Sequence, residues 1–212
     1  MNLLAKKLAH LLVENTNNSY AEDEIRYGIE IALGALFQII IIIMAAVPLG
    51  VGQEAMAIII AAGLYRRYTG GPHCQAYYRC TITSLVTYIL MSYISKYISD
   101  LFLPIYIIFV AVLSLLVIHH LAPVDNPTNT ITDESLKKKM KIQSYLVLLL
   151  LITTSIWAGY FIKQKPVALA LLLGILWQNF TLLPWGHVYI QLWDQFFERI
   201  EKIVSREEVL KC

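Results

Sequence analysis

Residues 27–47 read YGIEIALGALFQIIIIIMAAV, an apolar run that is centred on Ile39 to Ile43. A helix needs about 20 apolar residues to cross the hydrocarbon core of a bilayer, so this stretch is typical of a membrane-spanning helix. The composition agrees, because 58 % of the 212 residues are hydrophobic and only 15 % are charged. A soluble domain carries about 25 % charged residues. The sequence therefore predicts an integral membrane protein.

Five further apolar segments are candidates for crossing the bilayer. They cover residues 53–65, 77–97, 101–121, 144–162 and 166–183. The first of these is short and contains Glu54, so tilted, re-entrant and partly spanning placements all stay open for it. We expect an all-α fold: a polytopic bundle of about six transmembrane or re-entrant helices, formed by residues 1–212 as a single membrane domain.

Two amphipathic segments flank these helices, over residues 1–24 and 186–212. The apolar face of each is made of Leu4, Leu8, Leu11 and Leu12 in the first segment, and of Val188, Leu192, Trp193, Phe196, Phe197 and Ile200 in the second. Helices of this kind usually lie in the plane of the membrane–water interface. We therefore expect both segments to contact the lipid bilayer.

The distribution of lysine and arginine predicts the orientation of the chain. If the N-terminus is cytoplasmic and six segments cross, fourteen basic residues fall on the cytoplasmic side and three, Lys96, Lys163 and Lys165, on the other. Basic residues are enriched in cytoplasmic loops. We therefore expect a multi-pass protein of the cell membrane with both termini, the loop 66–80 and the basic loop 122–142 in the cytoplasm. The count holds only if the short segment crosses.

The composition also disfavours several classes of function. The net charge is only +2 and no basic stripe carries interleaved aromatic residues, so no nucleic-acid partner is expected. The three cysteines, Cys74, Cys80 and Cys212, have neither zinc-ligand nor redox spacing, which argues against a disulfide framework and a metal centre. A zinc protease is disfavoured because the chain has no His-Glu-x-x-His motif.

The loop between the second and third apolar segments combines a base with a nucleophile. Residues 66–80 read RRYTGGPHCQAYYRC and hold His73 and Cys80, seven residues apart. A cysteine acts as a nucleophile in its thiolate form. Cys80 would lie in the first turn of the third helix, where the positive end of the helix dipole favours an anion, and His73 would pair with it as an imidazolium or a general base.

The spacing also restricts the geometry of such a pair. In a continuous helix, seven residues would separate the two α-carbons by about 10 Å, so His73 must precede the helix and the chain must fold back. Gly70, Gly71 and a following proline suit that turn, and the N–H groups of the helix start would form an oxyanion hole. Cys74 is a rival nucleophile. A chance spacing with an interfacial histidine is the structural alternative.

Glu54 has two interpretations. A carboxylate inside a membrane segment is functional by default, so Glu54 would orient His73 or pair with Arg66 or Arg67. If its segment is interfacial, the carboxylate is simply solvated. Both readings stay open at this point.

Two further polar motifs lie in the second half of the chain. The cluster Lys137, Lys138 and Lys139 is most simply a cytoplasmic anchor, where each charge gains about 1 kcal/mol from anionic lipid; it would also attract an acidic peptide. Residues 179–181 (NFT) match a glycosylation sequon but lie within an expected span, so we assign them no role.

The loop residues resemble those of a known family. Residues 66–80 are similar to the active-site segment of the accessory gene regulator B (AgrB) family, membrane cysteine endopeptidases of Gram-positive quorum-sensing systems. The family pattern is an arginine, three residues, Gly-Gly, any residue, a histidine, six residues and a cysteine. The residues that match it are Arg66, Gly70, Gly71, His73 and Cys80. A second stretch, residues 122–127 (APVDNP) with the basic cluster beyond, looks like the family's loop after the fourth helix.

The resemblance implies an enzyme that processes a short pro-peptide. This AgrD-like partner has an amphipathic, membrane-bound N-terminal part and an acidic C-terminal part. Cys80 would attack a peptide carbonyl and release the acidic tail, while His73 would activate Cys80 and then protonate the leaving amine. The thioester acyl-enzyme would exchange with a cysteine or serine of the substrate, which closes a thiolactone or lactone ring.

Other expectations come with the resemblance. It implies a homodimer and requires neither a metal nor an organic cofactor. Arg66 and Arg67 would hold the acidic tail through charge-assisted hydrogen bonds, although retention of basic residues on the cytoplasmic side explains them equally well. The candidate orienting groups for His73 are Glu54, Gln75 and Asp125, and none is preferred.

Two other classes of function are consistent with the composition. A small-solute transporter or channel would use Glu54 and the central histidines as polar pathway residues. A structural or regulatory membrane subunit would use residues 66–80 merely as a connector. Neither class needs a reactive thiol, so a hyper-reactive cysteine that depends on His73 would favour the protease.

Overall fold

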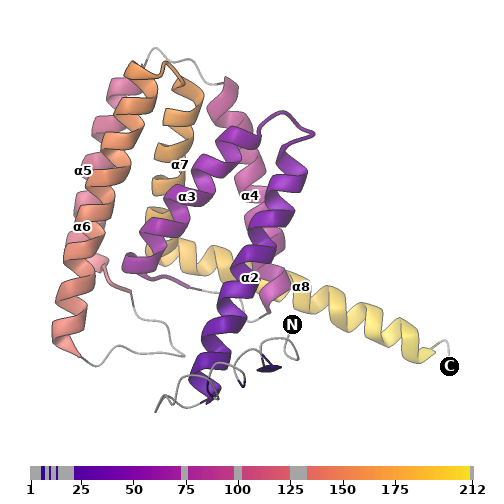
Figure 1. Cartoon of the computed structure of the whole chain (residues 1–212). Helices are drawn as coiled ribbons and strands as arrows, with labels where there is room; N and C mark the ends of the chain where they lie inside the picture. The colour runs from indigo at the N-terminus through magenta and orange to yellow at the C-terminus, as the bar shows by residue number, and fades with distance from the viewer. Residues whose placement is uncertain are drawn as a thin grey trace.

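A computed structural model of the chain describes residues 6, 7, 10, 13, 22–72, 76–97, 102–124 and 133–210, with side chains except at 22–24, 27 and 204–210. Within these ranges every named element is a helix (Figure 1). The helices are α2 (Glu22–Ala46), α3 (Gly52–Thr69), α4 (Tyr77–Tyr97), α5 (Leu103–Leu121), α6 (Glu134–Ile156) with a π-helical end η2 (Trp157–Phe161), α7 (Lys165–Leu182) and α8 (Pro184–Leu210). The predicted all-α fold is confirmed.

Several of these helices have the length and composition of membrane spans. The four stretches that are long and apolar enough are Gly28–Ala46, Leu103–Leu121, Glu134–Phe161 and Lys165–Leu182. They coincide with four of the six segments predicted from the sequence. The described chain is therefore a membrane helical bundle.

The other two predicted segments also form helices, α3 and α4, but their composition is more polar. α4 has the predicted bounds, and its buried face carries hydroxyl groups at Thr81, Thr83, Thr87, Ser92 and Ser95. Its outer face carries Val86, Leu90 and Ile94, which are 49 %, 59 % and 38 % exposed. The hydroxyl of Thr83 donates to the carbonyl of Arg79 at 2.9 Å, so it is satisfied within the helix. α4 is thus polar inside and apolar outside, which lowers its mean hydropathy.

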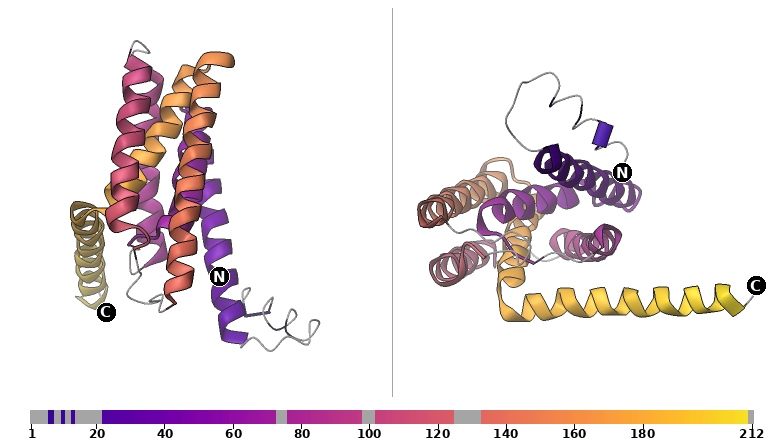
Figure 2. Two further views of the ribbon diagram at one scale, coloured as in Figure 1. Left: turned by 90° about the vertical axis from the view of Figure 1, so that its left-hand side faces the viewer. Right: turned by 90° about the horizontal axis from the view of Figure 1, so that it is seen from below.

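α3 and α7 form the centre of the bundle, with the other long helices around them (Figure 2). They descend side by side in the same direction (Figure 1) and meet through small residues. A Cβ atom on Gly174 of α7 would lie 2.8 Å from the Ala61 Cβ and 2.9 Å from the Ile58 carbonyl oxygen of α3. Small residues allow helix backbones in a membrane to approach closely. Gly174 therefore sets the distance between the two central helices.

α6 begins ten residues before the apolar stretch predicted at 144–162, because Asp133 caps it. The Asp133 carboxylate accepts hydrogen bonds from the Ser135 backbone N–H at 2.8 Å and the Ser135 hydroxyl at 3.0 Å. These bonds lower the pKa of the Asp133 carboxyl. Residues 137–141 are consequently part of a helix and not of the predicted loop 122–142.

α8 lies across one end of the bundle instead of along it (Figures 1 and 2). Its exposed apolar side chains recur every three or four residues, at Trp185, Val188, Leu192, Phe196, Ile200 and Ile203. As far as residue 203, the last with a described side chain, α8 has the helical, amphipathic character predicted for 186–212. Its position in the membrane interface stays a prediction. The other amphipathic segment, residues 1–24, lies mostly outside the described residues.

Because α3 and α7 approach closely at Gly174, we expect that adding one methyl group there lowers the stability of the fold. Gly174→Ala should destabilise the fold by about 1–3 kcal/mol, because a Cβ there overpacks the interface. Gly63→Ala on α3 is the matched control, since its Cβ would meet nothing within 4 Å. Thermal unfolding of the purified protein, followed by tryptophan fluorescence, should give a lower midpoint for Gly174→Ala alone. Equal midpoints for the two variants would contradict the central role of this contact.

Candidate functional site

The Gly-Gly pair ends α3 and turns the chain into an extended segment. Gly70 has φ +74° and Gly71 has φ +130°, values that favour glycine over residues with a Cβ. Gly70 forms a parallel bridge with Val124, and the Val124 N–H donates to the Thr69 carbonyl at 2.9 Å. A Cβ atom on Gly70 would lie 2.1 Å from the Val124 carbonyl oxygen. Glycine is thus required at position 70 both by its backbone conformation and by its contact with Val124.

Side chains of α3 and α7 hold the carbonyl groups of the same segment. The Nε2 atom of Gln178 donates to the Gly70 carbonyl at 2.8 Å and to the Thr69 hydroxyl oxygen at 2.9 Å. The Arg66 guanidinium donates to the Pro72 carbonyl. Residues 69–72 are therefore held by partners from α3, from α7 and from Val124, which follows the end of α5.

Gln178 belongs to a buried polar row that crosses the bundle. Its neighbour Asn179 accepts a hydrogen bond from the Tyr65 hydroxyl at 3.1 Å and donates to the Ser114 hydroxyl at 2.7 Å. Gln178 and Asn179 are each 1 % exposed. From the sequence, Asn179 was considered only as part of a glycosylation sequon and was assigned no role, and Gln178 was not singled out. Two adjacent amides in an otherwise apolar span were the available signal, since buried polar groups in membrane helices are expensive.

Cys80 lies in the first turn of α4, as expected from the sequence. The N–H groups of Arg79 and Cys80 both point to the Ala76 carbonyl, at 3.2 Å and 3.4 Å. The thiol is partly buried. α4 packs against both central helices, α3 and α7.

Several residues proposed from the sequence lie outside the described residues. These are His73, Cys74, Gln75 and Asp125. Their roles stay predictions. The described chain ends at Pro72 on one side of His73 and resumes at Ala76, one residue before α4.

The structure does not bring Glu54 to this region. Glu54 is in the first turn of α3 and only 8 % exposed. Twelve residues separate it from Arg66, which is about 18 Å along a helix. Glu54 is thus too far from Arg66 and Arg67 to form a direct ion pair with either. Its burial also contradicts the alternative in which the carboxylate is solvated.

The other basic residues proposed as supporting groups, on α3 and α6, lie at the end of the bundle that contains Gly70. Lys138 and Lys139 are exposed on the first turns of α6, and Lys137 is half-buried. At the same end, the Lys141 ammonium donates to the His119 carbonyl of α5 at 2.6 Å. Arg67 is exposed and its guanidinium lies 5.9 Å from the centre of the Tyr68 ring. Exposed cations therefore stand at this end of the bundle, next to the exposed Asp133 and Glu134 at the start of α6.

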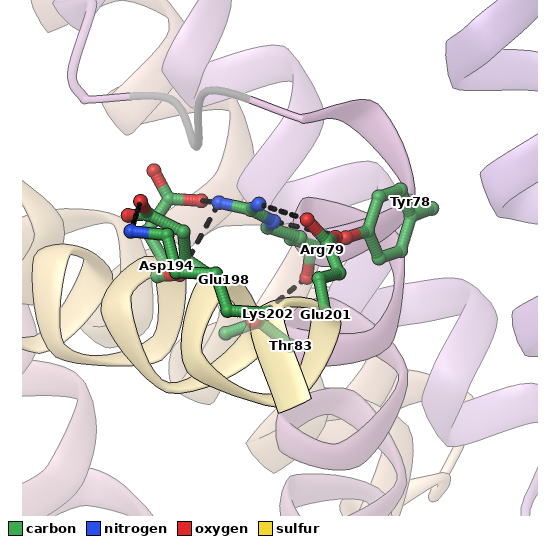
Figure 3. Close-up of polar contacts among 7 residues, drawn as sticks. All are labelled: Tyr78, Arg79, Thr83, Asp194, Glu198, Glu201 and Lys202. Carbon is green, nitrogen blue, oxygen red and sulfur yellow. Dashed lines mark hydrogen bonds and ion pairs between the residues drawn. The ribbon is translucent and has the colours of Figure 1, made fainter. Parts of the chain in front are cut away.

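Arg79 is a buried charge directly before Cys80 in the sequence, and it binds α8 (Figure 3). Its guanidinium contacts the Asp194 carboxylate at 3.1 Å and the Glu201 carboxylate at 2.9 Å. Its Nε atom donates to the Tyr78 hydroxyl at 3.0 Å. A side chain 8 % exposed needs such partners, because an unpaired buried charge is strongly destabilising. Sequence reasoning treated Arg79 only as a basic residue of the cytoplasmic side.

Aromatic rings extend the contact between α4, α7 and α8. Ring contacts with centroids 5.5 to 6.4 Å apart run in sequence through Phe180, Trp177, Tyr189, Trp193, Phe197 and Tyr78. Aromatic pairs at these separations add to the stability of a packed surface. The start of α4 is thus joined to α8 by both ionic and aromatic contacts.

Among the described residues, no group of three or more histidine, cysteine, aspartate or glutamate side chains could hold a metal ion.

Comparison with known proteins assigns the chain to a family. The family model described as "Accessory gene regulator B" matches residues 5–182. The chain belongs to the AgrB family. An AgrB-like protein 2 of Clostridium perfringens strain 13 is 27 % identical over 93 % of this chain and 96 % of the relative. The FsrB protein of Enterococcus faecalis is 26 % identical over 88 % of this chain and 75 % of the relative. No solved structure matches the chain.

The AgrB match confirms the resemblance seen in residues 66–80 and places the chain in a family of accessory gene regulation and quorum sensing. It contains the Gly-Gly segment, Cys80 and the Gln178 row. It ends at Leu182, the last residue of α7. α8 and the carboxylates that bind Arg79 therefore lie beyond the region shared with the AgrB family model.

The contact with Val124 predicts that two glycines of similar conformation respond differently to substitution. Gly70→Ala and Gly50→Ala both place a Cβ at φ near +70°, which costs about 1–2 kcal/mol. Only Gly70→Ala also forces a clash with Val124, since the nearest atom to a Cβ on Gly50 is the Lys96 Nζ at 3.4 Å. Hydrogen exchange of the Gly70 and Val124 amides should rise in Gly70→Ala and stay unchanged in Gly50→Ala. Equal protection in both variants would exclude the clash.

The ion pairs of Arg79 predict that the docking of α8 against α4 depends on this one side chain. Arg79→Ala leaves the Asp194 carboxylate, 13 % exposed, without its guanidinium, and should cost about 3 kcal/mol. Lys202→Ala is the control, because it removes an exposed ion pair with Glu198 that contributes little. Trp193 fluorescence and protease sensitivity of α8 should change in Arg79→Ala only. An α8 that stays protected in Arg79→Ala would show that the aromatic contacts suffice.

Proposed function

We propose that the chain is a membrane-embedded cysteine endopeptidase that cleaves a short, membrane-bound pro-peptide at the cytoplasmic side. The observation that carries the proposal is the position of Cys80 in the first turn of α4, together with the hydrogen-bonded Gly-Gly-Pro segment that directly precedes His73 in the sequence. Membership of the AgrB family supports it. The partner is an AgrD-like pro-peptide with an acidic C-terminal tail.

The reaction begins with the thiol of Cys80. The helix dipole of α4 favours its thiolate form, and His73 accepts the thiol proton as the general base. The sulfur attacks the scissile carbonyl, and N–H groups that precede Arg79 at the start of α4 stabilise the oxyanion. His73 then returns the proton to the leaving amine, which releases the tail and leaves a thioester on Cys80.

The second half of the reaction closes a ring. A cysteine or serine of the bound peptide attacks the thioester, so the acyl group moves to the substrate and the Cys80 thiol is regenerated. Exclusion of water protects the thioester from hydrolysis. The partly buried position of Cys80 supports this requirement.

In this proposal, exposed cations at the end of the bundle that contains Gly70 bind the acidic tail of the pro-peptide. Arg67, Lys138 and Lys139 are exposed there and can form charge-assisted hydrogen bonds with carboxylates. Arg66 has a different role in this proposal, because its guanidinium already holds the Pro72 carbonyl. The proposal includes a multi-pass orientation with both termini cytoplasmic and a homodimeric assembly.

Cleavage of the cognate pro-peptide in liposomes, followed by mass spectrometry, tests the proposal. Cys80→Ala and His73→Ala should lower the rate at least about 10³-fold, because removal of a nucleophile or its base disables the whole unit. Cys74→Ala is the matched control and should cleave normally. A tail-shortened cyclic product is expected from the active variants. If Cys80→Ala still cleaves, the nucleophile is wrong and the transporter alternative gains weight.

A further inference from the structure

The side-chain amide of Gln178 forms three hydrogen bonds, two as a donor and one as an acceptor. Both donated bonds go to the end of α3, one to the Thr69 hydroxyl and one to the Gly70 carbonyl. The amide oxygen accepts from the Thr181 hydroxyl at 3.2 Å. The Gly70 carbonyl can only accept, so the nitrogen of Gln178 must face it. The orientation of this amide is therefore determined by its surroundings.

We infer that Gln178 is a positioning residue for the active site, which holds residues 69–72 in the conformation that presents the base. The inference rests on the proposed function. Gln178 does not touch the reacting atoms; it acts through the backbone of the Gly-Gly segment.

The need for such a clamp follows from the glycines. Gly70 and Gly71 have the widest choice of backbone conformations of any residue type, so their own sequence does not fix the path of the chain. The carbonyls of Thr69, Gly70 and Pro72 are held by Val124, Gln178 and Arg66, respectively. Gln178 is the partner that comes from α7, the central helix packed against α3. It thereby ties the segment to the rigid centre of the bundle.

A purely structural role for Gln178 is the competing explanation, and the chain offers a matched control. Asn179 is the next residue of α7, is equally buried at 1 % exposure and carries the same amide group. Its hydrogen bonds go to Tyr65 and Ser114 and join helices to one another. Loss of Asn179 should thus reproduce the packing cost of losing a buried amide while the Gly-Gly segment keeps its clamp.

The experiment compares Gln178→Met with Asn179→Leu in the liposome cleavage assay. Each substitution replaces the amide by an apolar side chain of similar shape. Gln178→Met should lower kcat about 10²-fold with KM within about threefold, because a small displacement of a catalytic group has effects of this size. Asn179→Leu should keep kcat within about threefold of the unaltered chain even if its thermal midpoint falls equally. Hydrogen exchange at the Gly70 and Val124 amides should accelerate at least about tenfold in Gln178→Met and stay unchanged in Asn179→Leu.

Several outcomes would overturn the inference. An unchanged kcat for Gln178→Met, or an equal loss for Asn179→Leu, would reduce Gln178 to a packing residue. If Gln178→Met fails to fold, Gln178→Leu takes its place, because its side chain likewise cannot donate to the Gly70 carbonyl. Cys80→Ala is run alongside: cleavage by that variant rejects the proposed function, whereas the hydrogen-exchange result still decides whether Gln178 holds the segment.

Discussion

The contact between α3 and α7 is the constraint on which the rest of the structure depends. Gly174 lets the two helices approach until a Cβ would touch Ala61 and the Ile58 backbone. The helices run in the same direction, so nearer their C-terminal ends Asn179 contacts Tyr65 and Gln178 contacts Thr69. The small residues fix the distance between α3 and α7 and their rotation relative to each other. Because of this, the polar side chains of the two helices lie opposite one another. The segment that leads to the proposed base inherits its position from that arrangement.

Polar groups contribute differently to this bundle than to a soluble one. Lipid tails are as apolar as leucine, so burial of apolar side chains gives little preference for one helix neighbour over another in a membrane. Directional bonds such as those of Asn179 to Ser114 and of Arg79 to Asp194 supply that preference. Four of the hydroxyl groups on the inner face of α4 bond to carbonyls of their own helix, and that of Thr87 pairs with the Tyr189 hydroxyl of α8 at 3.5 Å. The exposed face of α4 carries apolar side chains such as Leu90.

The sequence predicted the helices well where apolar length was the signal, and α4 has its predicted bounds because turn residues precede it. It misplaced the start of α6, since the lysines of the first turns carry no apolar periodicity and only the cap at Asp133 marks the helix. The position of Cys80 followed from the helix start. Gln178 and Arg79 were missed for a common reason: a count of charges or of hydropathy treats a polar side chain as solvated, whereas their partners come from segments about 110 residues away in the sequence.

The ion pairs of Arg79 also restrict the rotation of α4 about its own axis. Consecutive residues of an α-helix point in directions about 100° apart. With Arg79 held against α8, the azimuth of the next side chain, Cys80, is set as well. A helix anchored only by apolar contacts can turn by a fraction of this angle at little cost in free energy, and a thiol on it would sweep an arc. The Arg79 guanidinium therefore couples two elements: the orientation of α8, which lies across the bundle, determines the direction in which the Cys80 sulfur faces.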